Sequence, residues 1–157
     1  MSSIHIVRDY PYPPQKVWLA LTDPELCKLW MVKAQPEGFS TTVGSTFQFV
    51  GKPMFGWNGI VNCKVLEALE PSVFRYSWLV EGGDLMECSY RLEPQGTGTR
   101  FTFDQTGFTG IGGFLIAKLI MTPVRKKMFG ANMLAVLQNT DDQGKLIPGS
   151  TLNPPVL

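Results

Sequence analysis

A strand-like segment followed by a long apolar helix closes the last third of the sequence. Residues Thr99–Gly107 read TRFTFDQTG and alternate apolar with polar side chains, and the helix runs from about Gly113 to Asn139. The helix is apolar on more than the single stripe that a surface helix presents to a core. Such a helix, placed after several strands, needs a concave sheet to lie on, and a curved sheet closed by a helix encloses a cavity. The sequence therefore predicts a pocket more clearly than it predicts a reaction.

Strand-like segments with a period of two occupy most of the chain before this helix. They are Ser3–Tyr10, Thr46–Val50, Gly56–Leu69, Ser72–Val80, Asp84–Leu92 and Thr99–Gln105. Turn residues separate the last five, which is typical of an antiparallel meander. Two short helices are expected after the first strand, one starting at Pro14 and one from Asp23 to about Trp30. These patterns predict an α+β fold with a curved antiparallel sheet of about six strands.

One face of the predicted sheet is strongly aromatic. Alternate positions place on it Phe47, Phe49, Val61, Val65, Phe74, Tyr76, Trp78, Cys88, Tyr90, Leu92, Phe101 and Phe103, whereas the other face carries polar residues. Only the C-terminal helix remains to cover the aromatic face. We expect one stripe of this helix to face the sheet, namely Met121, Val124, Met128, Ala131 and Ala135.

The second apolar side of the helix, which carries Phe129, Met133, Val136 and Leu137, also needs a cover. The two short helices or a partner subunit in a homodimer would supply it. Arg125, Lys126 and Lys127 are interpreted as a solvated face of the helix.

Length and charge limit the function classes. A chain of 157 residues suits one domain, here residues 1–140, followed by a Pro- and Gly-rich tail over 141–157 with little structure of its own. Fourteen basic against 13 acidic residues give a net charge of +1, which disfavours nucleic-acid binding. The longest apolar run, Ile111–Met121, contains Lys118 and is too short to span a membrane, so no stable membrane insertion is expected.

The three cysteines, Cys27, Cys63 and Cys88, are odd in number and widely spaced. This spacing disfavours both a disulfide framework and a zinc site, and it fits a reducing compartment. The N-terminal residues also lack the pattern of a signal peptide. We therefore expect a cytoplasmic protein.

Catalytic patterns are sparse. The only histidine is His5 in the first strand, so a histidine-based triad or a histidine metal cluster is excluded. The carboxylates fall at caps, in turns or on the polar face, and the sequence has no P-loop and no dinucleotide-binding glycine motif. We predict no catalytic residue, no metal and no cofactor, and an enzymatic role stays open with a non-enzymatic one favoured.

The order of elements resembles the START-like superfamily, which has the helix-grip fold. The segment PPQKVWLALTDPELCKLW, Pro13–Trp30, resembles the opening motif of the family named after the activator of Hsp90 ATPase. Val43–Ser45, LEALEPSVFRYSW at 66–78 and GTRFTFDQTGF at 98–108 are similar to further pieces of that family, although many relatives carry a His where Gln105 stands. The run LIAKLIMTPVRKK, residues 115–127, is similar to the polyketide-cyclase-like branch.

This resemblance, together with the aromatic face, implies a protein that binds a hydrophobic small molecule such as a lipid, polyketide or aromatic metabolite. The residues expected to line its cavity are Trp30, Phe47, Phe49, Trp57, Tyr76, Trp78, Tyr90, Phe101, Phe103, Gln105, Met121, Val124 and Met128. For any single aromatic residue, simple packing on the last helix is the plainer interpretation. A polyketide cyclase or aromatase is the first alternative, and a co-chaperone module acting on Hsp90 is the second.

Overall fold

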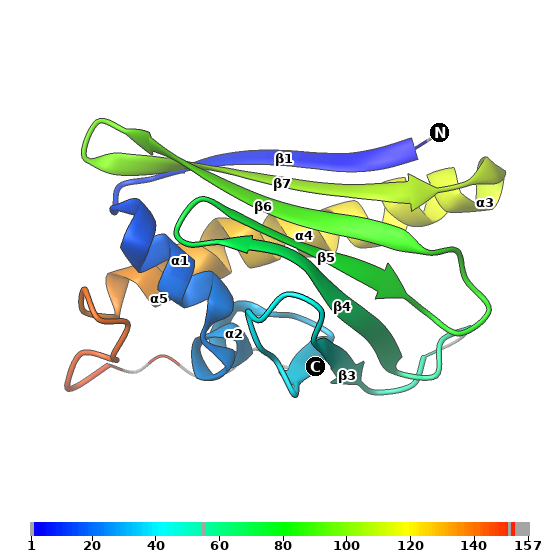
Figure 1. The fold of residues 1–157 in the computed structure, drawn as a ribbon, viewed down its shortest axis with the longest axis horizontal. Helices are drawn as coiled ribbons and strands as arrows, with labels where there is room; N and C mark the ends of the chain where they lie inside the picture. Colours follow the sequence, from blue (N-terminus) through cyan, green and yellow to red (C-terminus); the bar gives the residue numbers. More distant parts are fainter. Residues whose placement is uncertain (1, 55, 151, 153–157) are drawn as a thin grey trace.

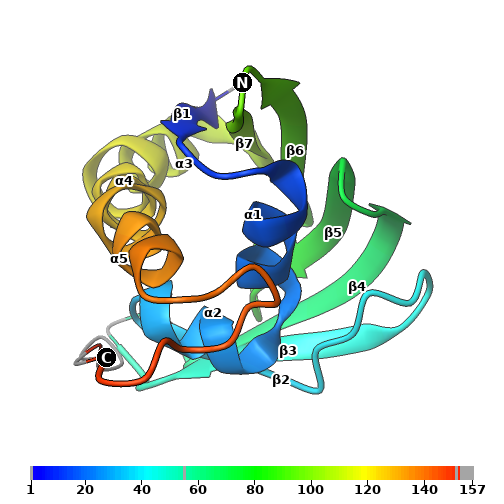
Figure 2. The same ribbon diagram turned by 90° about the vertical axis from the view of Figure 1, so that its left-hand side faces the viewer.

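A curved antiparallel sheet holds one long helix in its concave face (Figures 1 and 2). The computed structural model describes residues 2–54, 56–150 and 152, and for residues 2 and 114 the backbone alone. The strands are β1 (Ser2–Tyr10), β2 (Ala34–Glu37), β3 (Thr46–Gly51), β4 (Ile60–Leu69), β5 (Val73–Leu79), β6 (Met86–Gln95) and β7 (Gly98–Phe108). Their order across the sheet is β1-β7-β6-β5-β4-β3-β2. The predicted α+β helix-grip architecture is confirmed.

Two details of the sheet differ from the prediction. The structure adds β2, a four-residue edge strand that pairs with β3 and contains Pro36. Proline cannot donate a ladder hydrogen bond and is tolerated at a sheet edge, so this segment does not look like a strand in the sequence. The predicted strand at 56–69 begins only at Ile60, because Gly59 takes a left-handed φ of +87° in the β3–β4 hairpin.

The two short helices form as expected. They are α1 (Pro14–Thr22) and α2 (Pro24–Trp30). Asp23 ends the first and caps the second, because its carboxylate accepts a hydrogen bond from the Glu25 amide at 2.9 Å and Pro24 occupies the first helical position.

The C-terminal helix is continuous but changes its winding twice. It consists of α3 (Gly110–Leu115), the π-helical turn η1 (Ile116–Met121), α4 (Thr122–Lys127), the π-helical turn η2 (Met128–Asn132) and α5 (Met133–Gln138). At η1 the Thr122 amide and hydroxyl both donate to the Ala117 carbonyl, and Pro123 beyond it has no amide hydrogen to donate. At η2 Gly130 leaves helical geometry, and the Tyr10 hydroxyl donates to the Phe129 carbonyl at 2.6 Å.

The π turns change which residues face the interior. Met128 and Phe129 are buried, and the next buried position is Met133, five residues after Met128. Ala131, which a regular helix would place on the inner stripe, is exposed, so that part of the prediction was wrong. The inner side of α5 and η2 contacts α1 and α2, so the two short helices cover the second apolar side (Figure 2).

Beyond α5 the chain folds back toward the short helices. Thr140 forms an isolated bridge with Leu146, and its carbonyl accepts a hydrogen bond from Lys16 Nζ at 2.8 Å. Gly144 lies against Leu19 and Leu26. The last part of the predicted tail, residues 151 and 153–157, lies outside the described residues. Among the helices that are described, none is both long and apolar enough to cross a membrane.

Candidate functional site

The concave face of the sheet is lined with aromatic rings in mutual contact. Tyr90 is at its centre, and its ring centroid lies 5.7–5.9 Å from those of Phe74, Tyr76, Phe101 and Phe103. We call these rings the aromatic wall. Phe47 and Phe49 extend it, because their ring centroids lie 5.7 and 5.9 Å from that of Tyr76. The alternation in the sequence predicted this face correctly, because the sheet has one side in the core and one side in solvent.

The wall meets the helix directly at Phe129. This ring, fully buried, lies 4.9 Å from Phe103, 5.0 Å from Phe101 and 6.0 Å from Tyr90. On its other side it packs against Trp30 of α2 at 5.5 Å. The half of the interior near α1, α2 and α5 is therefore filled by side chains, and a guest could enter it only by displacing them.

The other half of the interior ends in apolar side chains that remain partly open to solvent. Trp78, Met86, Met121 and Val124 are half-buried. The β3–β4 and β5–β6 loops and the start of α3 frame this end, on the right in Figure 1. Hydrogen bonds join them: Asn58 donates to Glu81 at 2.9 Å, and Thr109 donates to Asp84.

The surface around this end is also apolar. Exposed hydrophobic side chains on α3, η1 and the β5–β6 loop are Leu85, Ile111, Leu115, Ile116, Leu119 and Ile120, of which Ile111 is 81% and Leu119 70% exposed. Isolated exposed apolar residues are ordinary, whereas contiguous apolar patches mark interaction or ligand sites, and five of these six residues lie within ten positions of one helix. By the open end of the grip we mean the half-buried Trp78, Met86, Met121 and Val124, the six exposed apolar residues around them and the loops that frame them.

A buried polar cluster lies just inside the open end. Gln105 of β7 is fully buried, and its carbonyl oxygen accepts a hydrogen bond from Arg125 Nη2 at 3.2 Å. The Gln105 amide in turn lies 3.5 Å from the Met86 sulfur. The Arg125 guanidinium carbon lies 4.8 Å from the Trp78 ring centre and 5.2 Å from that of Phe103, so the cation contacts two aromatic rings.

The burial of Arg125 corrects the sequence interpretation. Lys126 and Lys127 are exposed as expected, but Arg125 is only 4% exposed and points into the core. Its spacing from Met121 and Met128, four and three residues, is that of one helical face, and this signal was available in the sequence. The run of three cations obscured this signal, because charged residues that are adjacent in a sequence are usually all exposed to solvent.

The phenols and thiols around this cluster keep their protons at neutral pH. Burial raises the pKa of Cys88 to about 12, and the positive charge of Arg125 offsets part of that rise. Burial likewise raises the pKa of Cys63, Tyr76 and Tyr90 well above their usual values. The Tyr76 and Tyr90 hydroxyls are 3.1 Å apart and share a hydrogen bond. These groups can donate hydrogen bonds but are not poised as nucleophiles or bases.

The structure brings most of the predicted lining residues into one interior, but not all into one place. Phe47, Phe49, Tyr76, Trp78, Tyr90, Phe101, Phe103 and Gln105 lie on the concave face, and Met121, Val124 and Met128 lie on the helix opposite. Trp30 lies in the filled half, where its indole donates to the Ala20 carbonyl at 2.8 Å. Trp57 lies in the β3–β4 hairpin, where its indole donates to the Ile60 carbonyl at 3.0 Å.

Two surface hollows formed by described residues have no residue of the C-terminal helix in their lining. One of about 560 Å³ is lined by Glu37, Gly38, Thr46, Phe47, Gln48, Asn62 and Cys63, and one of about 260 Å³ by Asp9, Tyr10, Pro11, Gln95, Thr97, Gly98 and Thr99. His5 pairs with Asp104 at 2.5 Å on the exposed face of the sheet, away from both the interior and the hollows. Within the described residues no group of His, Cys, Asp and Glu side chains is placed to hold a metal ion.

Comparison with solved structures supports the fold assignment. Protein MLL2253 from Mesorhizobium loti superposes with a TM-score of 0.75 at 24% identity, over 89% of this chain and 99% of that protein. CalU16 from Micromonospora echinospora superposes with a TM-score of 0.60 at 23% identity, over 87% of this chain and 81% of the CalU16 chain. DynU16, described as a protein of the dynemicin biosynthetic locus, gives 0.70 at 19% identity over 88% of this chain, which spans about half (48%) of DynU16. At these identities the likeness establishes the fold alone.

The fold that these structures share defines a helix-grip protein. The sequence model of the Activator of Hsp90 ATPase homolog 1-like proteins matches residues 11–112, more than half of the chain. The chain therefore belongs to that family. No curated protein matches the sequence.

Proposed function

We propose that this protein binds a hydrophobic small molecule, such as a lipid, polyketide or aromatic metabolite, between the sheet and the first half of the C-terminal helix. The observation that carries the proposal is the open end of the grip, where Trp78, Met121 and Val124 stay half-buried beside a fully aromatic wall. Binding of such a molecule requires no catalytic residue. We place the protein in the cytoplasm as part of this proposal, because its three cysteines are buried and free.

The side chains at the open end suit a site that forms around its guest. Ligand pockets are mostly apolar and contain a few polar groups that fix orientation, and Gln105 and Arg125 are such groups here. Met86, Met121 and Met128 surround them, and unbranched thioether side chains adopt new rotamers at low cost. Rotation of these methionines makes room without disturbing the packing around Phe129.

Filling the open end with a larger side chain is expected to block binding. We expect the neutral fluorescent probe N-phenylnaphthylamine to bind the wild-type protein with increased emission, and Val124→Trp to weaken its affinity by about tenfold or more, since a bulkier residue occupies the guest's space. Fluorescence titration measures both affinities.

A matched substitution on the same helix provides the control. Ala131→Trp adds a large ring at an exposed position, and its affinity for the probe is expected to equal that of the wild type. Equal weakening by both variants, or wild-type affinity in Val124→Trp, would argue against a site at the open end. Failure of the wild-type protein to bind the probe at all would remove the proposed function.

A cyclase-type enzyme is the second candidate, because residues 115–127 are similar to the polyketide-cyclase-like branch and DynU16, which shares the fold, is described as a protein of the dynemicin biosynthetic locus. In that role the interior would fold a polyketide chain by proximity and orientation. The described interior offers hydrogen-bond donors from Tyr76, Tyr90 and Arg125 but holds no carboxylate or histidine to act as a base. We rank activation of Hsp90, which the family description names, below both, because the sequence carries no strongly charged docking surface.

A further inference from the structure

Arg125 is a buried cation without an ionic partner among the residues that the structure describes. All Asp and Glu side chains of the chain lie among the described residues, and none of the ion pairs formed there includes Arg125. A guanidinium keeps its positive charge in proteins. Burial of an unpaired charge costs several kcal/mol in the effective estimates for real proteins, about the size of a domain's whole stability. Such a residue needs a reason beyond packing.

The contacts of Arg125 use only part of its hydrogen-bonding capacity. A guanidinium carries five N–H donors. Nη2 donates to Gln105 at 3.2 Å, Nη1 makes a weak contact of 3.8 Å with the Met128 sulfur, and Nε is buried with no partner among the described residues. The edge of a guanidinium that includes Nε binds carboxylate and related oxyanions through two parallel hydrogen bonds.

The residues around Arg125 are those of a site that a ligand can reach from solvent. Met121, one helical turn before it, and Val124, next to it in the chain, are half-buried, and the Trp78 ring against which it stacks is half-buried too. Its helical segment α4 is bracketed by the π turns η1 and η2. Turns of this kind frequently accompany functional sites in helices.

We propose that Arg125, held in place by Gln105 and Trp78, binds the anionic group of an amphipathic ligand whose apolar or aromatic body occupies the open end of the grip. This inference rests on the proposed function and names the ligand class: an organic monoanion of the carboxylate or sulfonate type on a hydrophobic frame. The single cation suits a single negative charge. The anion would complete the hydrogen bonding of Nε and neutralise the buried charge.

A matched pair of probes separates recognition of the anion from recognition of the frame. Anilinonaphthalene sulfonate has the same two aromatic units as N-phenylnaphthylamine and adds one sulfonate. We expect Arg125→Met to weaken sulfonate-probe binding by at least about tenfold, which is about 1.4 kcal/mol. The affinity for the neutral probe should stay the same or rise. Lys126→Met removes an exposed cation at the adjacent position and should leave both affinities at wild-type values.

The outcomes distinguish this inference from the proposed function. If Arg125→Met binds the sulfonate probe as tightly as the wild type while both proteins bind the neutral probe, the anion site is refuted and the hydrophobic site stands. If the wild type binds neither probe, the proposed function fails, and the anion site fails with it.

A second measurement on the unmodified protein covers the case of a variant that does not fold. The Nε–Hε resonance of Arg125 in an isotope-labelled sample is expected to move downfield when the sulfonate probe is added, because Hε gains a hydrogen bond to the anion. The neutral probe should cause only a ring-current shift without that hydrogen bond, and the same downfield shift with both probes would overturn the proposal. Replacement of Arg125 by methionine removes the cost of a buried charge but also the donor to the Gln105 carbonyl, so the melting temperature should change little. A large fall with unchanged sulfonate binding would assign Arg125 a purely structural role.

Discussion

Phe129→Ala is expected to lower the free energy of unfolding by about 3–5 kcal/mol. The ring is fully buried and connects the helix both to the sheet and to α2. Its centroid lies within 5.5 Å of the ring centroids of Phe101, Phe103 and Trp30. Its removal leaves a cavity that these large rings cannot close. Urea unfolding followed by tryptophan fluorescence measures the loss.

Leu119→Ala is the matched control for this experiment. It also truncates an apolar side chain of the same helix, but Leu119 is 70% exposed, so the change should stay within about 0.5 kcal/mol. A loss below about 1 kcal/mol for Phe129→Ala would mean that the filled half of the grip is loosely packed, contrary to the structure.

Alkaline conditions are expected to destabilise the protein steeply. Burial raises the pKa of the three thiols and of Tyr10, Tyr76 and Tyr90, and for Cys88 it reaches about 12 from a usual 9.0. Above about pH 9 for the thiols and about pH 10 for the phenols, the unfolded chain releases these protons while the folded chain retains them. The unfolded state then binds fewer protons, so stability falls as the pH rises. Each fully shifted group contributes about 1.4 kcal/mol per pH unit.

Cys88→Ala tests this linkage. The variant should lose stability at every pH through its altered packing, but between pH 9 and 12 its stability should fall with a slope that is smaller by about 1.4 kcal/mol per pH unit. Urea midpoints at several pH values give both slopes. Identical slopes for the variant and the wild type would show that the Cys88 thiol is not shielded from solvent in the folded protein.

The sequence predicted the architecture well because its periodicities are strong. The alternation from Phe47 to Phe103 marks one buried face, and the Asp23–Pro24 pair marks the start of α2. The edge strand β2 escaped prediction because four residues containing a proline carry too little pattern. The π turns escaped because single-residue changes of winding leave no clear trace in hydrophobic spacing, and Ala131 was therefore placed on the inner stripe although it is exposed.

The candidate site was predicted less completely than the fold. Aromatic lining residues follow from strand alternation, so their positions were accessible to sequence reasoning. The interior is divided into a filled half around Phe129 and an open end. This division depends on which side chains of different elements pack together, and a single sequence does not show those contacts. Arg125 illustrates the difference: its spacing from Met121 and Met128 indicates the inner face of the helix, but its contacts with Gln105 and Trp78 come from two strands that are distant in the sequence.

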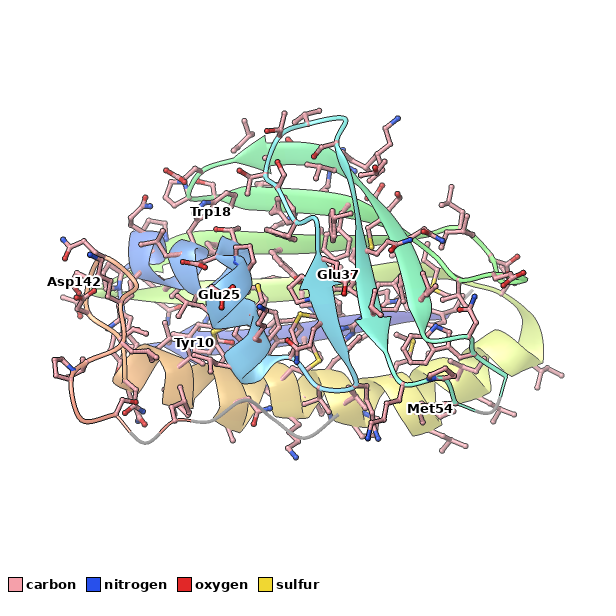
Figure 3. All side chains as sticks on the ribbon, turned by 90° about the horizontal axis from the view of Figure 1, so that it is seen from below. Tyr10, Trp18, Glu25, Glu37, Met54 and Asp142 are labelled. Carbon is pink, nitrogen blue, oxygen red and sulfur yellow. The ribbon has the colours of Figure 1, made fainter. Side chains whose placement is uncertain are left out.

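Methionine methyl resonances test the central claim, a ligand site at the open end of the grip, most directly. Met86, Met121 and Met128 lie at the site, Met31 lies in the filled half, and Met54 lies in the β3–β4 hairpin, opposite Asp142 along the molecule in Figure 3. Addition of N-phenylnaphthylamine to methyl-labelled protein is expected to shift the resonances of Met86, Met121 and Met128 and to leave that of Met31 unchanged. Shifts confined to Met31, or no shift at saturating probe, would contradict the account.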